Sequence, residues 1–111
     1  MRFMMLMFPK GYDSVKPGTR PAPAMMAYNT ELKKAGVLLA LDGLHSPSRG
    51  ARVSFADGKA TVTDGPFAEA KEVVGGYWMI QVKSRDEAIE WAKRIPCAPD
   101  EFVELRQVME F

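Results

Sequence analysis

Three patterns along the chain together predict an α+β fold. Several apolar runs have the length of a β-strand, two segments space their apolar residues as a helix does, and one Asp-Gly pair separates two short alternating stretches. The resulting order is strand–helix–strand, hairpin, strand–helix–strand. This order predicts a ferredoxin-like βαββαβ sandwich with an extra β-hairpin arm.

The bulk composition fits one soluble domain. A length of 111 residues predicts a single domain spanning 1–111. A net charge of +1, without a cluster of Lys or Arg, argues against a nucleic-acid partner. The N-terminal apolar run Phe3 to Phe8 is too short for a membrane span or a signal-peptide core, so we expect a cytoplasmic protein without membrane attachment. One Cys and one His make no zinc-type cluster, and neither a metal nor a cofactor is expected.

The N-terminal half predicts two strands and a helix. Phe3 to Phe8 contains no polar residue and therefore predicts a strand that is buried on both faces. Residues 9 to 23 are rich in Pro and predict a long loop. A helix begins at about Ala24 and ends before Gly36, and Val37 to Leu44 follows as a strand. The inward stripe of the predicted helix is Met25, Tyr28, Leu32 and Ala35.

The middle of the chain predicts a hairpin and a further strand. Arg52 to Phe55 and Ala60 to Thr63 flank Asp57-Gly58, which is a strong signal for a tight hairpin turn. Val74 to Val82 is an apolar run with Gly75-Gly76 at its start, and it predicts a strand of the main sheet.

The C-terminal segment predicts the second helix and the last strand. Ser84 and Glu87 have the spacing of a capping box, so a helix begins after Ser84. Pro96 follows the end of this helix, and Phe102 to Met109 predicts the closing strand. The inward stripe of the helix is Ala88, Trp91, Ala92 and Ile95.

Both faces of the predicted sheet are apolar, although two helices can cover only one of them. Because strand side chains alternate, Tyr77 and Met79 face opposite to Trp78 and Ile80. A large exposed apolar face is unfavourable for a soluble monomer. A second copy of the chain, related by two-fold symmetry, is the simplest cover, so we predict a homodimer.

The segment Thr63-Asp64-Gly65-Pro66-Phe67 is the most distinctive motif. Gly65 allows a positive φ, and Pro66 fixes its own φ and restricts Gly65 before it, so the segment holds the Asp64 carboxylate in one place. Two interpretations stay open. Asp64 either accepts backbone hydrogen bonds in a turn, or it lies in a cleft and serves as an acid or base.

This motif, with Glu69, Lys71-Glu72 and Gly75-Gly76-Tyr77 after it, resembles the DGPF-type branch of the YCII-related family. The resemblance covers essentially the whole chain and implies a dimeric α+β barrel built from ferredoxin-like subunits. It implies no settled activity. The wider family is discussed as a set of cofactor-free enzymes that use an Asp with a His, and Asp64 occupies the motif position. His45 lies in a segment that resembles a Gly-Leu-x-Pro pattern of the family, and the x position of that pattern is variable.

His45 is nevertheless the only histidine, and we predict it as the catalytic partner of Asp64. Arg49 and Arg52 are predicted ligand-binding residues, because a guanidinium pairs with a carboxylate through two parallel hydrogen bonds. The alternative for both is a solvated hairpin edge. Ser46 and Tyr77 complete the predicted ligand-binding set.

Two functions follow from these residues. One is a small cofactor-free enzyme in which Asp64, assisted by His45, performs acid–base chemistry on a small metabolite. The other is a non-catalytic ligand-binding or accessory module in which Asp64 only shapes the turn. A weaker alternative is haem held by His45.

Overall fold

The computed structural model describes residues 1–10, 21–67 and 72–111. The predicted loop 9–23 and the charged segment after Phe67 therefore lie largely outside the described residues. Within them, the elements in chain order are β1 (Arg2–Phe8), α1 (Pro23–Lys34), β2 (Leu38–Gly43), the short 3-10 turn η2 (Pro47–Arg49), β3 (Ala51–Ala56), β4 (Lys59–Asp64), β5 (Gly76–Gln81), α2 (Arg85–Lys93) and β6 (Phe102–Gln107).

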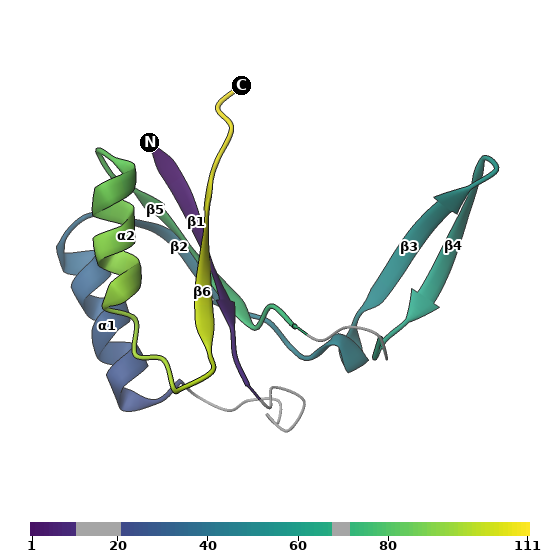
Figure 1. Cartoon of the computed structure of the whole chain (residues 1–111), viewed down its shortest axis with the longest axis horizontal. Helices are drawn as coiled ribbons and strands as arrows, with labels where there is room; N and C mark the ends of the chain where they lie inside the picture. Colours follow the sequence, from purple (N-terminus) through teal and green to yellow (C-terminus); the bar gives the residue numbers. More distant parts are fainter. Residues whose placement is uncertain (11–20, 68–71) are drawn as a thin grey trace.

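Four strands form one antiparallel sheet in the order β2-β5-β1-β6. Strand β1 lies in the middle because both β5 and β6 pair with it, and β2 and β6 are the edges. Helices α1 and α2 lie on the same side of this sheet (Figure 1). The predicted α+β class is confirmed, and the strand order is consistent with a ferredoxin-like sandwich.

The core lies between this sheet and the helices. Met5, Leu32 and Ile80 have no exposed surface and come from β1, α1 and β5. Tyr28 packs edge-on against Trp78 and donates a hydrogen bond to the Trp91 carbonyl oxygen over 2.7 Å, so it connects α1 to α2. The predicted inward stripes are confirmed, except that Ala35 is exposed at the end of α1.

The two helices begin in different ways, α2 with a side-chain cap and α1 with a proline. The Ser84 hydroxyl accepts a hydrogen bond from the Glu87 backbone N–H over 3.1 Å, as the capping box predicts. The Glu87 carboxylate reaches one residue further back and accepts from the Lys83 N–H over 2.9 Å. Helix α1 instead begins with Pro23, whose fixed φ suits a first helical position.

The opposite face of the sheet is open. Met4, Leu6 and Phe8 are half-buried there, whereas their neighbours in β1 are buried under the helices. Phe8 stacks on Phe102 with ring centroids 4.6 Å apart. The expectation that β1 is buried on both faces therefore holds for only one face within a single chain.

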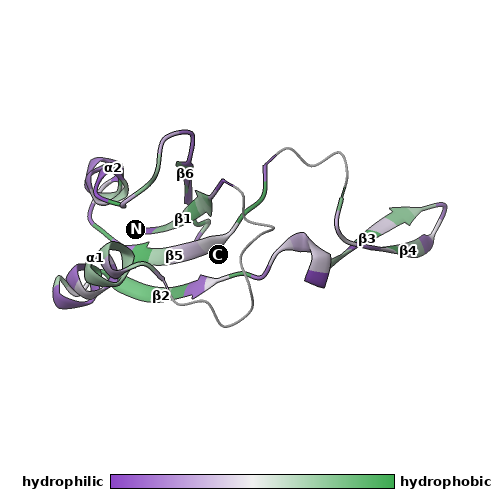
Figure 2. Cartoon of the chain, turned by 90° about the horizontal axis from the view of Figure 1, so that it is seen from below, coloured by the Kyte–Doolittle hydropathy of each residue, from purple (hydrophilic) through white to green (hydrophobic). Residues whose placement is uncertain are grey.

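Strands β3 and β4 form a separate two-stranded sheet around the turn Asp57-Gly58. Both turn residues have positive φ, 51° and 74°, as a hairpin of this type requires. The hairpin projects from the side of the main sheet that the helices leave open (Figures 1 and 2). Every residue of both strands is exposed.

Candidate functional site

The junction between the main sheet and the hairpin is built around Gly65. The Gly65 N–H donates to the Gly50 carbonyl oxygen over 3.0 Å, which ties the end of β4 to the start of β3. A Cβ on Gly65 would lie 1.7 Å from the Pro47 carbonyl oxygen, so no larger residue fits without moving the η2 turn. The close approach of the Pro47 backbone thus explains why the distinctive motif has glycine at position 65.

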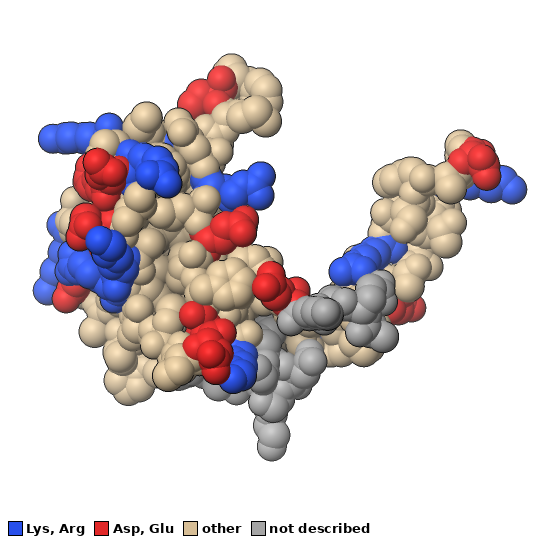
Figure 3. Space-filling model, viewed as in Figure 1, with Lys and Arg blue, Asp and Glu red and all other residues tan. Residues whose placement is uncertain are grey.

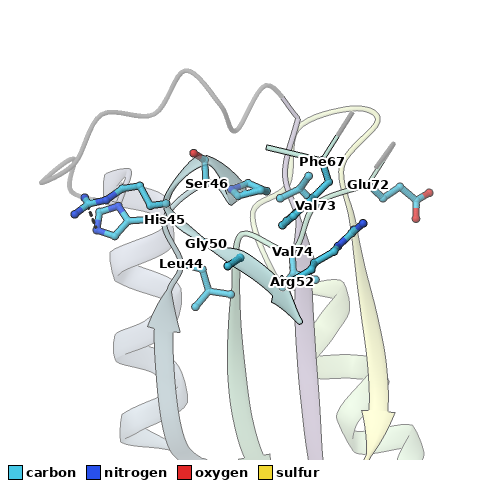
Figure 4. Close-up of a pocket in the computed structure, with 12 residues that line it drawn as sticks. Leu44, His45, Ser46, Gly50, Arg52, Phe67, Glu72, Val73 and Val74 are labelled. Carbon is cyan, nitrogen blue, oxygen red and sulfur yellow. Dashed lines mark hydrogen bonds between the residues drawn. The ribbon is translucent and has the colours of Figure 1, made fainter. Parts of the chain in front are cut away.

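A cavity of about 500 Å³ lies at this junction. Its lining comes from the segment that links β2 to β3, from Phe67 and from residues 72–74 (Figure 4). Leu44, Phe67, Val73 and Val74 give it an apolar surface, and His45, Ser46, Arg49, Arg52 and Glu72 supply polar groups. Four of the six predicted site residues therefore line one cavity.

His45 and Arg49 form one polar group of the cavity. The Arg49 guanidinium lies 3.3 Å from His45 Nε2. Because a guanidinium is only a donor, Nε2 is the acceptor in this hydrogen bond. Ser46 and Ser48 share a further hydrogen bond of 2.6 Å between their hydroxyls.

Arg52 and Glu72 lie on the other side of the cavity from His45 (Figure 4). The Arg52 guanidinium sits 4.0 Å from the centre of the Phe67 ring, in a cation–π contact. Phe67, the last residue of the distinctive motif, therefore orients the Arg52 side chain. The cavity thus has an apolar middle with charged groups toward both sides.

Asp64 is placed differently from the other candidates. It is the last residue of β4, paired with Ala51, and it is exposed and absent from the cavity lining. Among the described residues, no side-chain hydrogen bond reaches its carboxylate and none joins it to His45. Among the described residues, the Asp64 carboxylate therefore makes no hydrogen bond that would support either interpretation, the turn cap or the acid–base pair with His45.

Tyr77 lies on the open face of the main sheet. Its hydroxyl donates to Asp42 Oδ2 over 2.6 Å, and this hydrogen bond raises the pKa of Tyr77. Sequence reasoning missed Asp42, which lines a second, smaller cavity together with Tyr77. The sequence signal that could have identified Asp42 is its position as an acidic residue within the apolar run of β2.

The described part of the chain contains neither a candidate metal site nor a helix that could span a membrane. No group of three or more His, Cys, Asp or Glu side chains gathers there in a way that could hold a metal ion. None of the helices in residues 1–10, 21–67 and 72–111 is long and apolar enough to cross a membrane.

Two comparisons with known proteins found similarity to this chain. An uncharacterized protein of Rhizobium meliloti (strain 1021) is 33% identical over 69 residues, which make up 62% of this chain and 56% of that protein. The chain thus matches little more than half the length of this relative. A family model described as a YCII-related domain matches residues 1–111. Because that match covers the whole chain, the protein belongs to the YCII-related family.

Proposed function

We propose that the protein binds a small anionic metabolite with an apolar body in the cavity at the base of the hairpin. The observation that carries this proposal is that Arg49, Arg52, His45 and Ser46 all line one cavity with an apolar surface. A site with mostly apolar lining and a few placed polar groups is the usual form of a small-molecule site.

Arg49 is the main anion partner in this proposal. Its guanidinium carries five N–H donors, and among the described residues the only side-chain hydrogen bond that it makes goes to His45. The remaining donors can grip a carboxylate in two parallel bonds. His45 then has a positioning role, because its Nε2 holds the guanidinium. Two Arg against one Glu among the described lining residues also favour an anion.

Acid–base catalysis by Asp64 and His45 stays a prediction. His45 lines the cavity and Asp64 does not, so the geometry supports binding more directly than turnover. The Asp64→Asn variant separates the two. It leaves ligand binding unchanged in a binding module, and it abolishes ligand turnover in an enzyme that uses Asp64.

The proposal includes a two-fold homodimer that forms a dimeric α+β barrel. Met4, Leu6, Phe8 and Met79 leave an apolar sheet face without a cover from the helices. Strands β3 and β4 also have one apolar face, where Val53 is paired with Val62, next to Phe55. An isolated two-stranded hairpin is at best marginally stable in water. A second copy that packs against both surfaces would remove them from water together.

Calorimetric titration with benzoate tests the binding proposal, because benzoate joins a carboxylate to an apolar ring. Arg49→Gln should weaken benzoate binding about tenfold or more, since a hydrogen bond to a charged group contributes about 1.5–3 kcal/mol. The matched control is Arg85→Gln, which removes the same charge from the exposed first turn of α2. Equal weakening by both variants, or no benzoate binding to the wild-type chain, would contradict the proposal.

A further inference from the structure

Strand β2 is an edge of the main sheet, and no described strand pairs with its outer side. The Leu44 N–H donates to the Gly75 carbonyl oxygen over 2.9 Å, toward β5. In an antiparallel ladder, residues of this kind alternate with residues whose backbone groups point the other way. Leu41 and Gly43 therefore direct their N–H and C=O groups outward, where no described strand or turn bonds to them. This edge can pair with one more strand.

A groove of about 530 Å³, called the edge groove below, lies between β2 and helix α1. Its described lining residues are Met26, Asn29, Thr30 and Lys33 from α1 and Leu38, Leu39, Ala40 and Leu41 from β2. Met26 and Leu39 are 49% and 50% exposed. A strand added about 4.8 Å beyond β2 would direct alternate side chains toward the flank of α1. The edge groove thus offers the space that the helix-side residues of an added strand need.

The two sides of the β2 edge differ in chemistry. On the helix side, Leu38 and Leu41 pack against the core. On the open side, Asp42 is paired with Tyr77 and accepts its hydroxyl hydrogen bond over 2.6 Å. An added strand would therefore meet an apolar surface with one set of its side chains and a carboxylate with the other.

The charge of the edge groove is also unevenly placed. Lys33 is the one charged residue among its described lining residues, and it forms no ion pair within the described part of the chain. Helix α1 runs opposite to β2, so Lys33 lies where β2 begins and Met26 lies toward its end (Figure 1). A strand antiparallel to β2 would therefore pass the apolar end of the groove first and Lys33 afterwards.

We propose that the β2 edge binds an extended segment of a partner protein as a fifth, antiparallel strand of the main sheet. The segment has an apolar residue opposite Leu41, a basic residue directly before it and an acidic residue two positions after it. The apolar side chain lies in the edge groove, the basic one lies beside Asp42, and the acidic one pairs with Lys33. The edge groove shares no described lining residue with the cavity at the hairpin base, so this inference does not depend on the anion-binding proposal.

The peptide acetyl-Lys-Leu-Thr-Glu-amide tests this inference in a two-dimensional NMR titration of the isotope-labelled full chain. We expect saturable shifts at the amides of Leu39, Leu41 and Gly43. N-methylation of the peptide Leu, whose N–H faces β2, should weaken binding at least about tenfold, because the methyl group removes a hydrogen bond and keeps the strands apart. The matched control is N-methylation of the peptide Thr, whose N–H points away from β2, and it should leave the affinity unchanged.

Charge variants of the chain supply an independent test. Lys33→Gln should weaken peptide binding about two- to fivefold, which is the range of an exposed ion pair. Lys34→Gln removes the same charge one residue further on, outside the described lining, and should change nothing. Lys33→Glu should bind the peptide with Lys in place of its Glu more tightly than the original peptide.

Three results would overturn the inference. The first is a wild-type chain without saturable shifts along β2, and the second is equal weakening by the two N-methyl groups or by the two Gln variants. The third is a fall in sedimentation mass when the peptide binds, because the β2 edge would then be an interface between copies of this chain.

Discussion

The body of the molecule (β1, β2, β5, β6, α1 and α2) and the hairpin (β3 and β4) share an alternating pattern of side chains but differ in burial. In the body, alternate residues of β1 and β5 are buried under the helices. In the hairpin, Val53, Phe55 and Val62 are 52%, 80% and 65% exposed. Charged residues gather over the helices, whereas the hairpin between its base and its tip is mostly uncharged (Figure 3). The alternation thus identifies an apolar face in both regions, but the single chain supplies a cover in only one.

This difference also explains where the candidate site lies. The cavity at the hairpin base occupies the boundary between a region with a core and a region without one. Gly65 and Phe67 fix that boundary by packing against Pro47 and Arg52. A partner that orders the hairpin would therefore also order one wall of the cavity.

The largest expected effect is in the body. Ile80→Ala removes a fully buried side chain, and we expect the free energy of unfolding to fall by about 2–5 kcal/mol. Denaturation by urea measures this change. Thr61→Ala on the polar face of the hairpin should change stability by less than about 0.5 kcal/mol. Similar losses in the two variants would break the contrast between body and hairpin.

The next effect concerns the proposed partner of the hairpin. Phe55→Ala should weaken the homodimer at least about tenfold, because a large aromatic side chain at an interface commonly contributes about 2 kcal/mol. Analytical ultracentrifugation at micromolar concentration measures it. The wild-type chain should sediment as a dimer, and Phe55→Ala should shift toward the monomer. A wild-type monomer, or a variant that dimerises as tightly, would exclude the hairpin from the interface.

The smallest effect is a pH dependence within the body. Burial raises the pKa of Tyr28 above its ordinary value. The neutral phenol thus stabilises the fold below pH about 10, and this stability is lost as the pH rises further, because the unfolded chain ionises first. Tyr28→Phe should cost about 1 kcal/mol at neutral pH through the lost bond to Trp91 but should lessen the fall in melting temperature above pH about 10. If the melting temperature of Tyr28→Phe fell above pH about 10 as steeply as that of the wild-type chain, a group other than Tyr28 would cause the fall.

Local patterns predicted the fold well, because each depends on neighbours in the sequence. The Ser84 cap and the Asp57-Gly58 turn are examples in which a few adjacent residues determine the geometry. The predicted grouping of His45, Ser46, Arg49 and Arg52 also follows from proximity along the chain.

The rest of the site depends on contacts between distant segments. Asp42 and Tyr77 are 35 positions apart and meet through the pairing of β2 with β5. The sequence alone does not specify that register. Asp64 lies outside the cavity because of its position at the end of β4, which the motif itself does not reveal.

The central claim is that the junction between body and hairpin is a ligand site. Its most direct test is a two-dimensional NMR titration of the isotope-labelled full chain with benzoate. We predict saturable shifts at the amides of His45, Arg49, Arg52 and Val74, with the fully buried core residues unaffected. Shifts spread over the whole surface without saturation, or confined to the Asp42 cavity, would contradict the claim.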